Sequence, residues 1–450
     1  MRKIPLFQRK ETFKEVSEGF NEEEAVKEAQ RCLQCSPPPC QEACPLKIDI
    51  KEFIKFIAAR EFKKAEEKIR EQNTLPSICG RVCPQENLCQ KKCTLAKKGK
   101  PISIGYLERF VSDREENSEN LKTISPGKRK NKVAVVGSGP AGLTCASELL
   151  KKGFRVVILE ALQKEGGVLR YGIPEFRLPK KVLDKEVEYI KRLGGEIVTN
   201  FVVGKTKSIE DLKKEGFNVF FLGIGAGFPK FLGIKGENAK DVYSANEFLT
   251  RINLMKGYLF PKYHTPLRIG KKIGIIGGGN VAFDCARCAI RLKAEEVFII
   301  YRREKEEMPA RKEEIKNACE EGVKFYFLST PKEIISDEEG NVKGIICLRN
   351  QPGERDSSGR RKPIPIKNSE FLVPLDTVIV AIGTEANPLL LNTMPDLKLN
   401  EKGYIVVNKD FQTSIPYIFA GGDIVSGTAT VVEAIKQGKA AAKSIERLYG

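Results

Sequence analysis

The feature that most restricts the possible folds of this chain is a pattern that occurs twice. The segments VAVVGSGPAGL, from Val133, and IGIIGGGNVAF, from Ile273, each join an apolar run to a glycine turn and then to a helical pattern. Strand, glycine turn and helix form the start of a dinucleotide-binding unit, in which the helix N-terminus faces a pyrophosphate. Strand and helix patterns alternate after about residue 132, so the sequence predicts an α/β protein with two Rossmann-like dinucleotide-binding domains.

The first unit has the spacing of a dinucleotide-binding turn. Gly137 permits a tight turn, Gly139 lets the backbone approach a pyrophosphate, and Gly142 lets the helix pack closely on the strand. The following strand, residues 156–159, ends at Glu160, where a carboxylate binds the hydroxyls of a ribose. The candidate residues of this site are Gly137, Gly139, Pro140, Ala141, Gly142 and Glu160.

A third strand-like segment lies near the C-terminus. IPYIFAGGDI, from Ile415 to Ile424, is an apolar run followed by Gly-Gly-Asp. We expect this segment to complete the first unit, with the second unit inserted between its two parts.

The second unit differs from the first at the position that contacts the ribose. Its strand at residues 297–300 is followed by Arg302 and Arg303 rather than by an acid. An acid would repel a 2′-phosphate, whereas an arginine pair binds it through charge-assisted hydrogen bonds. The pattern therefore predicts an NADP(H) site that includes Gly277, Gly278, Gly279, Val281, Arg302 and Arg303.

Cys285 and Cys288 form a C-x-x-C pair early in the helix of this second site. A redox-active dithiol is one interpretation. We favour the other, in which two small side chains one turn apart pack against the sheet.

Eight of the 13 cysteines fall within the first 93 residues, in two runs of four. The runs are Cys32-x2-Cys35-x4-Cys40-x3-Cys44-Pro and Cys79-x3-Cys83-Pro-x5-Cys89-x3-Cys93. Two groups of four thiolates suit two [4Fe–4S] clusters, and Cys-Pro is typical of ferredoxin-like loops. Zinc is the alternative. The uneven spacing, and the flavin and NADP signals in the same chain, favour iron–sulfur clusters and an electron-transfer chain.

The cysteine-rich region is expected to be helical. Apolar residues from Ile48 to Asn73 recur at helical spacing, and a polar stretch with Ser125–Pro126–Gly127 indicates a linker. We therefore expect three parts: a helical iron–sulfur domain at residues 1–128, an FAD-binding domain at residues 129–230 and 385–450, and an NADP-binding domain at residues 231–384.

Composition excludes several other classes of protein. The one histidine, His264, and the lack of tryptophan argue against catalytic triads and histidine zinc sites. The sequence has no apolar run long enough to span a membrane and no signal core at its start, so we expect a cytoplasmic protein. The net charge of +18 fits an acidic partner or, as we prefer, a solvated Lys/Glu-rich surface; no nucleic-acid motif is present.

The motifs together resemble one family over nearly the whole chain. The chain is similar to the small, or beta, subunit of NADPH-dependent glutamate synthase. Its relatives include the large subunit of bifurcating NADH-dependent ferredoxin:NADP oxidoreductase, also called the sulfide dehydrogenase alpha subunit, and the N-terminal half of dihydropyrimidine dehydrogenase. The segments that carry the resemblance are CGRVCPQENLC, IGYLERF, GSGPAGL, GGVLRYGIPEFRLPK, GGGNVAFD, YRREKEEMPAR and AGGDIVSGTATVVEAI.

The resemblance implies more about the ligand sets than spacing does. It assigns one [4Fe–4S] cluster to Cys32, Cys35, Cys40 and Cys93, and the other to Cys44, Cys83, Cys89 and Glu108, where counting alone would use Cys79. To the FAD site it adds Gly167, Arg177, Val203, Gly422, Asp423, Thr430 and Val431. To the NADP site it adds Asn280, Arg311, Ala381, Ile382 and Gly383.

The implied activity is an NADPH oxidoreductase subunit in which FAD accepts hydride and two clusters pass electrons to a partner. The sequence has no amidotransferase or FMN-barrel pattern, so the chain alone should reduce dyes without making glutamate. We expect a hetero-oligomer of the glutamate synthase type. The alternatives are the FAD subunit of a bifurcating transhydrogenase, with ferredoxin and an NADH-linked flavoprotein as partners, a thiol–disulfide reductase using Cys285 and Cys288, and a basic nucleic-acid-binding or scaffold protein.

Overall fold

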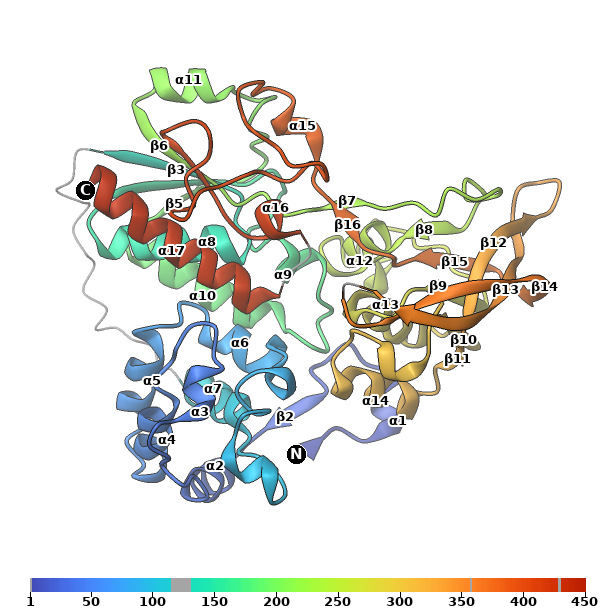
Figure 1. The fold of residues 1–450 in the computed structure, drawn as a ribbon, viewed down its shortest axis with the longest axis horizontal. Coiled ribbons are helices and arrows are strands. Elements are labelled where there is room, and N and C mark those ends of the chain that lie inside the picture. The colour runs from blue at the N-terminus through green and yellow to red at the C-terminus, as the bar shows by residue number, and fades with distance from the viewer. Residues whose placement is uncertain (1, 115–130, 357, 428–429) are drawn as a thin grey trace.

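The computed structural model describes residues 2–114, 131–356, 358–427 and 430–450. Figure 1 shows a helical N-terminal part beneath a first α/β part, with a second α/β part beside both. The predicted linker at Ser125–Pro126–Gly127, and the predicted boundary at residue 128, lie outside the described residues.

The N-terminal part consists of short helices whose buried apolar side chains form one continuous core with those of the first α/β part. The apolar period from Ile48 to Asn73 is divided between two helices, because the backbone reverses near Arg60, which has a φ of 61°. Ile50, Phe53, Ile54 and Ile57 are buried on the first of these helices. The helices are α2 (Glu22–Gln30), α3 (Pro39–Glu42), α4 (Ile50–Ala58), α5 (Phe62–Arg70), α6 (Pro76–Val82), η1 (Gln85–Asn87), η2 (Thr94–Lys97) and α7 (Ile104–Asp113).

The first α/β part is a five-stranded parallel sheet. Its strand order is β17-β6-β3-β4-β5, so the C-terminal strand β17 pairs with β6, and the prediction that C-terminal sequence completes the first unit is confirmed. The strands are β3 (Lys132–Val136), β4 (Arg155–Leu159), β5 (Glu196–Val198), β6 (Phe217–Leu222) and β17 (Ile418–Ala420). The helices are α8 (Pro140–Lys151), α9 (Val168–Tyr171), α10 (Lys180–Arg192), α11 (Ile209–Lys214), α15 (Pro388–Leu391), α16 (Asp423–Ser426) and α17 (Val431–Tyr449).

The second α/β part has a parallel sheet of order β11-β10-β9-β15-β8. All of its strands lie in sequence between β6 and β17, so the prediction that the second unit is inserted into the first is confirmed. A three-stranded antiparallel sheet, which the sequence did not lead us to expect, packs beside it (Figure 1). The parallel strands are β8 (Val242–Ser244), β9 (Lys272–Ile276), β10 (Glu296–Ile300), β11 (Lys324–Tyr326) and β15 (Thr377–Val380). The remaining elements are α12 (Ala245–Asn253), η3 (Gly257–Leu259), α13 (Asn280–Arg291), η4 (Lys305–Glu307), α14 (Lys312–Glu321), β12 (Ser329–Ser336), β13 (Val342–Arg355) and β14 (Arg361–Pro374).

Two chain crossings connect the α/β parts. They pair as a short antiparallel ribbon of β7 (Phe228–Pro229) and β16 (Thr384–Glu385). The predicted limits of the inserted domain, residues 231 and 384, lie at or next to this ribbon; the division into domains stays a prediction. Among the described residues, no helix is both long and apolar enough to cross a membrane.

An N-terminal arm reaches from the helical part to the second α/β part. It comprises β1 (Arg2–Lys3), α1 (Leu6–Arg9) and β2 (Ser17–Gly19). Arg9 pairs with Glu320 on α14 at 2.7 Å, and the Val16 N–H donates to the carbonyl oxygen of Phe176 at 3.0 Å. The arm therefore ties all three parts of the molecule together.

Candidate functional site

The first glycine turn is packed tightly at two of its glycines and open at the third. A Cβ on Gly137, whose φ is 96°, would lie 2.6 Å from the Gly223 oxygen, and a Cβ on Gly142 would lie 1.9 Å from the Gly137 oxygen. A Cβ on Gly139 would meet only the Gly223 oxygen, at 4.0 Å. The open space at Gly139 and the start of α8 at Pro140 fit a pyrophosphate at a helix N-terminus.

Glu160 lies at the end of β4 and faces this turn. One of its carboxylate oxygens accepts hydrogen bonds from the Ser138 N–H, at 2.9 Å, and from the Ser138 hydroxyl. The other accepts from the Leu162 N–H at 2.9 Å. These bonds hold a buried carboxylate beside the glycine turn, where a ribose would lie. Ser138 is a contact that spacing did not identify.

The C-terminal FAD candidates return to the same turn. A Cβ on Gly422 would lie 3.1 Å from the Ala141 Cβ, so the start of α16 at Asp423 is placed beside the start of α8. Thr430 caps α17 by accepting from the Glu433 N–H at 3.3 Å, and Val431 begins that helix. Gly422 and Asp423 thus lie beside the first glycine turn, and Thr430 and Val431 begin α17, which packs against α8.

Of two further FAD candidates, Gly167 packs against the turn and Val203 does not. Gly167 approaches it closely, since its Cβ would lie 2.8 Å from the Gly139 Cα. Val203 is buried in the core on the other side of the sheet.

Arg177, in contrast, points into the second α/β part. Its guanidinium pairs with Asp284 at 2.6 Å and with Glu314 at 3.4 Å, and all three side chains are buried. Burial raises the pKa of Asp284 to about 6, and one of its carboxylate oxygens has no hydrogen-bond partner among the described residues. Burial also opposes ionisation of Glu314, but Arg177 and Arg287 outweigh it and lower the pKa of Glu314 to about 2. The structure does not place Arg177 with the other FAD candidates.

Tyr171 is a candidate for the first site that spacing missed, although it lies inside the GGVLRYGIPEFRLPK segment. Its main-chain oxygen accepts from the Asn253 side chain at 2.9 Å. Its hydroxyl lies toward the crossing at Gly227, whose Cβ would be 3.6 Å away. Burial, and then the charges of Asp423 and Glu160, raise the pKa of this phenol to about 12. Only its aromatic character distinguishes it in the sequence.

The second glycine turn repeats the first. A Cβ on Gly277 would lie 2.3 Å from the Ala381 oxygen, and one on Gly278 would lie 2.6 Å from the Tyr301 ring. A Cβ on Gly279 would have no neighbour within 4 Å. The turn formed by Ala381, Ile382 and Gly383 follows β15 and adjoins the glycine turn, and Asn280 and Val281 begin α13.

The three arginine candidates of this site differ in their surroundings. Arg302 is exposed, and no ion pair joins it to another described residue. Arg303 is buried and donates to the Arg361 oxygen and to Asp356, both at 2.7 Å. Arg311 is buried toward the helical part, where it donates to the Arg81 oxygen at 2.8 Å. Of the three, Arg302 is thus the most available to a phosphate.

The C-x-x-C pair is fully buried on α13. Burial raises the pKa of both Cys285 and Cys288, whereas a reactive dithiol needs a low pKa and access to solvent. Their place in the second core fits the packing interpretation.

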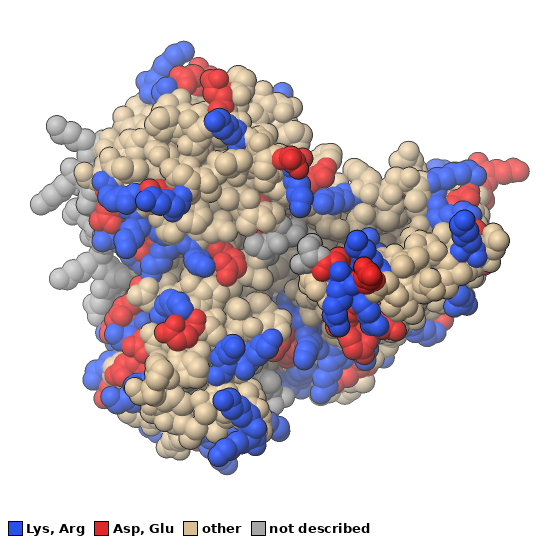
Figure 2. Space-filling view, in the orientation of Figure 1, with Lys and Arg blue, Asp and Glu red and all other residues tan. Residues whose placement is uncertain are grey.

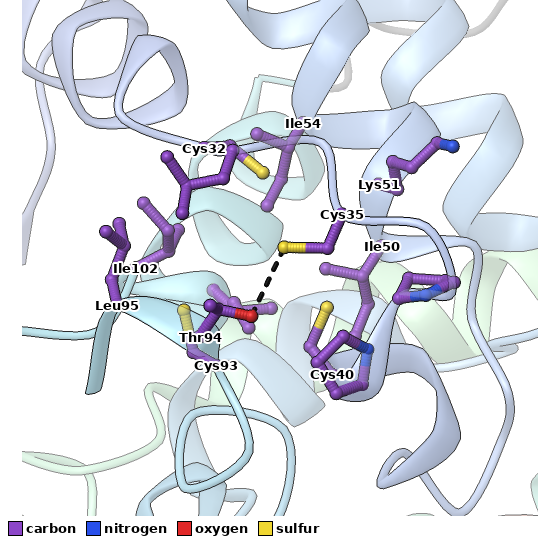
Figure 3. Close-up of a pocket in the computed structure, with 14 residues that line it drawn as sticks. Cys32, Cys35, Cys40, Ile50, Lys51, Ile54, Cys93, Thr94, Leu95 and Ile102 are labelled. Atoms are coloured by element: carbon purple, nitrogen blue, oxygen red, sulfur yellow. Dashed lines mark hydrogen bonds between the residues drawn. The ribbon is translucent and has the colours of Figure 1, made fainter. Parts of the chain in front are cut away.

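Cys32, Cys35, Cys40 and Cys93 line one pocket together with apolar side chains. Figure 3 shows the four sulfur atoms around a common space, with the Cys35 thiol 3.2 Å from the Thr94 hydroxyl. Burial, together with the neighbouring thiols of Cys32 and Cys93, raises the pKa of Cys40 to about 11. Four sulfur donors in an apolar setting fit the donor set of an iron–sulfur cluster.

A second donor group, made of Cys44, Cys83, Cys89 and Glu108, is buried. Burial raises the pKa of Cys89, and the charges of Cys83, Cys44 and Glu108 raise it further, so these four groups lie close together. Burial also raises the pKa of Glu108 to about 8. Cys79 lies beside the same group.

Asn73 forms hydrogen bonds with Glu108 and with Cys79, the two candidates for the eighth cluster ligand. Its amide nitrogen donates to Glu108 at 2.8 Å, and its oxygen accepts from the Cys79 thiol at 3.8 Å. The choice between Glu108 and Cys79 therefore stays a prediction.

Within the described residues, no three His, Cys, Asp or Glu side chains are arranged to hold one metal ion. A single zinc ion draws its thiolates to about 2.3 Å from one centre, whereas a cubane cluster is wider. Neither donor group therefore has the arrangement of a single-zinc site.

Comparison with known proteins agrees with this arrangement. The family described as dihydropyrimidine dehydrogenase domain II, 4Fe-4S cluster, matches residues 9–120, and the family described as pyridine nucleotide-disulphide oxidoreductase matches residues 131–438. The small chain of NADPH glutamate synthase from Escherichia coli K12 is 37% identical over 98% of this chain and 95% of that one. This chain belongs to the glutamate synthase small-chain family. The small chain from Halomonas elongata is 34% identical over 98% of this chain and 94% of its own length.

Members of the wider family occur in other complexes. The beta subunit of NADP(+)-dependent formate dehydrogenase from Moorella thermoacetica is 37% identical over 91% of this chain and 59% of that subunit. Among solved structures, FprA of Mycobacterium tuberculosis in complex with NADPH has a TM-score of 0.59, with 21% identity over 71% of this chain and 84% of that one. This likeness concerns the fold.

Membership in the glutamate synthase small-chain family confirms the predicted class. The chain is an NADPH-dependent flavin oxidoreductase with a [4Fe–4S] domain.

Proposed function

We propose that the chain is the electron-input subunit of a glutamate synthase-type complex, in which NADPH reduces FAD and two [4Fe–4S] clusters pass the electrons to a partner subunit. The observation that carries the proposal is the pair of donor groups in one small domain. The group of Cys32, Cys35, Cys40 and Cys93 is open toward solvent, and the group around Glu108 is buried. When bound, the flavin accepts two electrons together and the clusters carry them singly.

At the second site, the residues of this chain select and orient the nucleotide. Gly279 leaves room for a pyrophosphate, and Arg302 is free to bind a 2′-phosphate. Arg303, which follows strand β10, is held in place by its ion pair with Asp356. We include Asn280, Arg311 and the 381–383 turn on the strength of the family resemblance.

At the first site, Gly139 and the N-terminus of α8 would hold the FAD pyrophosphate, and Glu160 the ribose. Asp423 and Thr430, at the starts of α16 and α17, would bind the remaining polar groups of FAD. Tyr171 lies between this site and the crossing to the second unit, where it would shield the meeting place of the two cofactors from water. The reaction needs no acid–base side chain, because the residues act through position and charge.

We assign residues 1–128 to the cluster domain, 129–230 and 385–450 to the FAD domain, and 231–384 to the NADP domain. Of the buried donor group, Cys44 lies between α3 and α4, Cys83 and Cys89 follow α6, and Glu108 lies on α7. Helix α6 packs against α10 and α17 of the first α/β part. Burial of this group and exposure of the other support an order in which electrons leave through Cys32, Cys35, Cys40 and Cys93.

The partner is expected to be a large subunit of the glutamate synthase type. The likeness to a formate dehydrogenase beta subunit favours, as a second candidate, the same electron-input role beside another redox subunit, as in a bifurcating transhydrogenase. Co-purification of the native complex under anaerobic conditions tests both. We expect bound flavin, roughly eight iron atoms per chain, NADPH-dependent dye reduction and no glutamate formation by the chain alone. Colourless protein with zinc would contradict the proposal.

A further inference from the structure

The loop that carries Cys93 is strongly basic. The segment KKCTLAKKGK, residues 91–100, contains five lysines, and no acidic residue occurs between Glu86 and Glu108. Lys91, Lys92, Lys97, Lys98 and Lys100 are all exposed.

These five lysines form no ion pair with any described residue. Within the described part of the chain no carboxylate forms an ion pair with any of them, whereas Lys47 and Lys55 of the same domain pair with Glu42 and Glu52. Figure 2 shows basic side chains gathered over the lower edge of the helical part. Five like charges in ten residues repel one another, so this surface is better stabilised by an anionic partner than by itself.

The basic loop borders the solvent-open cysteine pocket. Cys93, Thr94 and Leu95 from this loop line the pocket, as does Leu33, whose side chain is 57% exposed. Lys51, from α4, lines its opposite side (Figure 3). An apolar centre within a charged rim is the arrangement of a protein–protein interface.

We propose that this face, made of Leu33, Lys51, Lys91, Lys92, Lys97, Lys98 and Lys100, docks an acidic redox protein that takes electrons from the adjacent cysteine group. The inference rests on the proposed function and adds the chemistry of the partner. NADPH gives two electrons and one proton on oxidation to NADP⁺, so two molecules of a one-electron carrier are reduced in each turnover. Nucleic acid or an anionic membrane would also bind lysines, but neither needs an apolar residue and a thiol pocket at the centre.

The test compares two triple variants of the full-length holoenzyme. The first is Lys92→Glu, Lys97→Glu and Lys98→Glu. The matched control is Lys205→Glu, Lys402→Glu and Lys409→Glu, three exposed lysines of the first α/β part that have no ion pair among the described residues. Both variants change the net charge equally. The acceptors are an acidic plant-type ferredoxin and a neutral quinone dye, assayed with NADPH at low and at high ionic strength.

We expect the first variant to raise KM for the ferredoxin at least tenfold at low salt and to abolish its dependence on salt, since screened attraction is what it removes. The control should change that KM less than twofold, and both variants should reduce the dye like the wild type. Equal effects of the two variants, or no ferredoxin reduction by an active wild type, would overturn the inference.

Two other outcomes would overturn it as well. One is loss of iron from the first variant. The other is loss of its binding to phosphatidylglycerol vesicles or duplex DNA while the ferredoxin KM stays unchanged. Absence of dye reduction by the wild type would instead count against the proposed function.

Discussion

The Arg311 guanidinium donates from Nη1 to the main-chain oxygen of Arg81 at 2.8 Å. It also lies 3.4 Å from Glu86, so one side chain of the second α/β part contacts the chain on both sides of Cys83. The positive charge of Arg311 is close enough to lower the pKa of the Cys83 thiol, although burial raises it overall. Arg311 thus connects the nucleotide-binding part to the loop of the buried donor group.

Replacement of Arg311 by Gln should therefore affect the cluster more than the nucleotide. A cation near a thiolate ligand favours the reduced cluster, so its loss should shift the midpoint potential of the Cys83-side cluster to a more negative value. Redox titration followed by electron paramagnetic resonance measures this shift. Arg311→Lys, which keeps the charge, should stay near the wild type. An Arg311→Gln protein with unchanged potentials and weak NADPH binding would place this residue in the nucleotide pocket instead.

Arg302→Glu should distinguish the two nicotinamide nucleotides. Loss of a charge-assisted phosphate contact, and the repulsion that replaces it, should lower kcat/KM for NADPH roughly 10- to 100-fold. The value for NADH should change by less than about threefold, since NADH lacks the 2′-phosphate. Steady-state kinetics with a dye acceptor compares the two, and an equal loss with both nucleotides would argue against the assignment of Arg302.

The eighth cluster ligand can be identified by iron content. We assign the eighth ligand to Glu108 on the family resemblance, so Glu108→Ala should lose or alter one cluster, while Cys79→Ser should keep both. Iron analysis and electron paramagnetic resonance of anaerobically prepared protein measure the result. The reverse pattern would identify Cys79 as the ligand.

Glu314 should give the protein an acid-sensitive stability. The pKa of this carboxylate is lowered in the folded chain to about 2 from an ordinary 4.5. Its stabilising effect is therefore complete above about pH 4.5 and is lost as the pH falls toward 2, with a size of the order of 3 kcal/mol. Glu314→Gln should lower Tm at pH 7 by roughly 3 °C and weaken the fall of Tm between pH 5 and 3. Parallel Tm curves for the variant and the wild type would show that Glu314 contributes no such linkage.

The sequence predicted the parts of the fold that repeat a local pattern. The glycine turns, the strands around them and the completion of the first sheet by residues 418–420 follow from apolar runs and glycine spacing. The grouping of Cys32, Cys35 and Cys40 with the distant Cys93 came from the family resemblance, since spacing alone does not show which loops meet.

The remaining features depend on contacts between distant segments. Nothing near Arg177, Arg303 or Arg311 in the sequence indicates that their guanidinium groups face Asp284, Asp356 and Glu86. The N-terminal arm lacks any apolar period, and its position on α14 depends on single polar contacts such as Arg9 with Glu320. Side-chain direction is decided by packing partners, and a local pattern does not contain them.

The late position of β17 affects how the chain is synthesised. The ribosome makes β6 about 200 residues before it makes Ile418–Ala420, the strand that pairs with it. During that interval the nascent sheet has an open edge, whereas the inserted unit has all of its strands once residue 380 has been made, before Ile418. A chain that stops anywhere between residues 223 and 417 would therefore expose an aggregation-prone edge, so premature termination in the inserted unit also prevents completion of the unit around it.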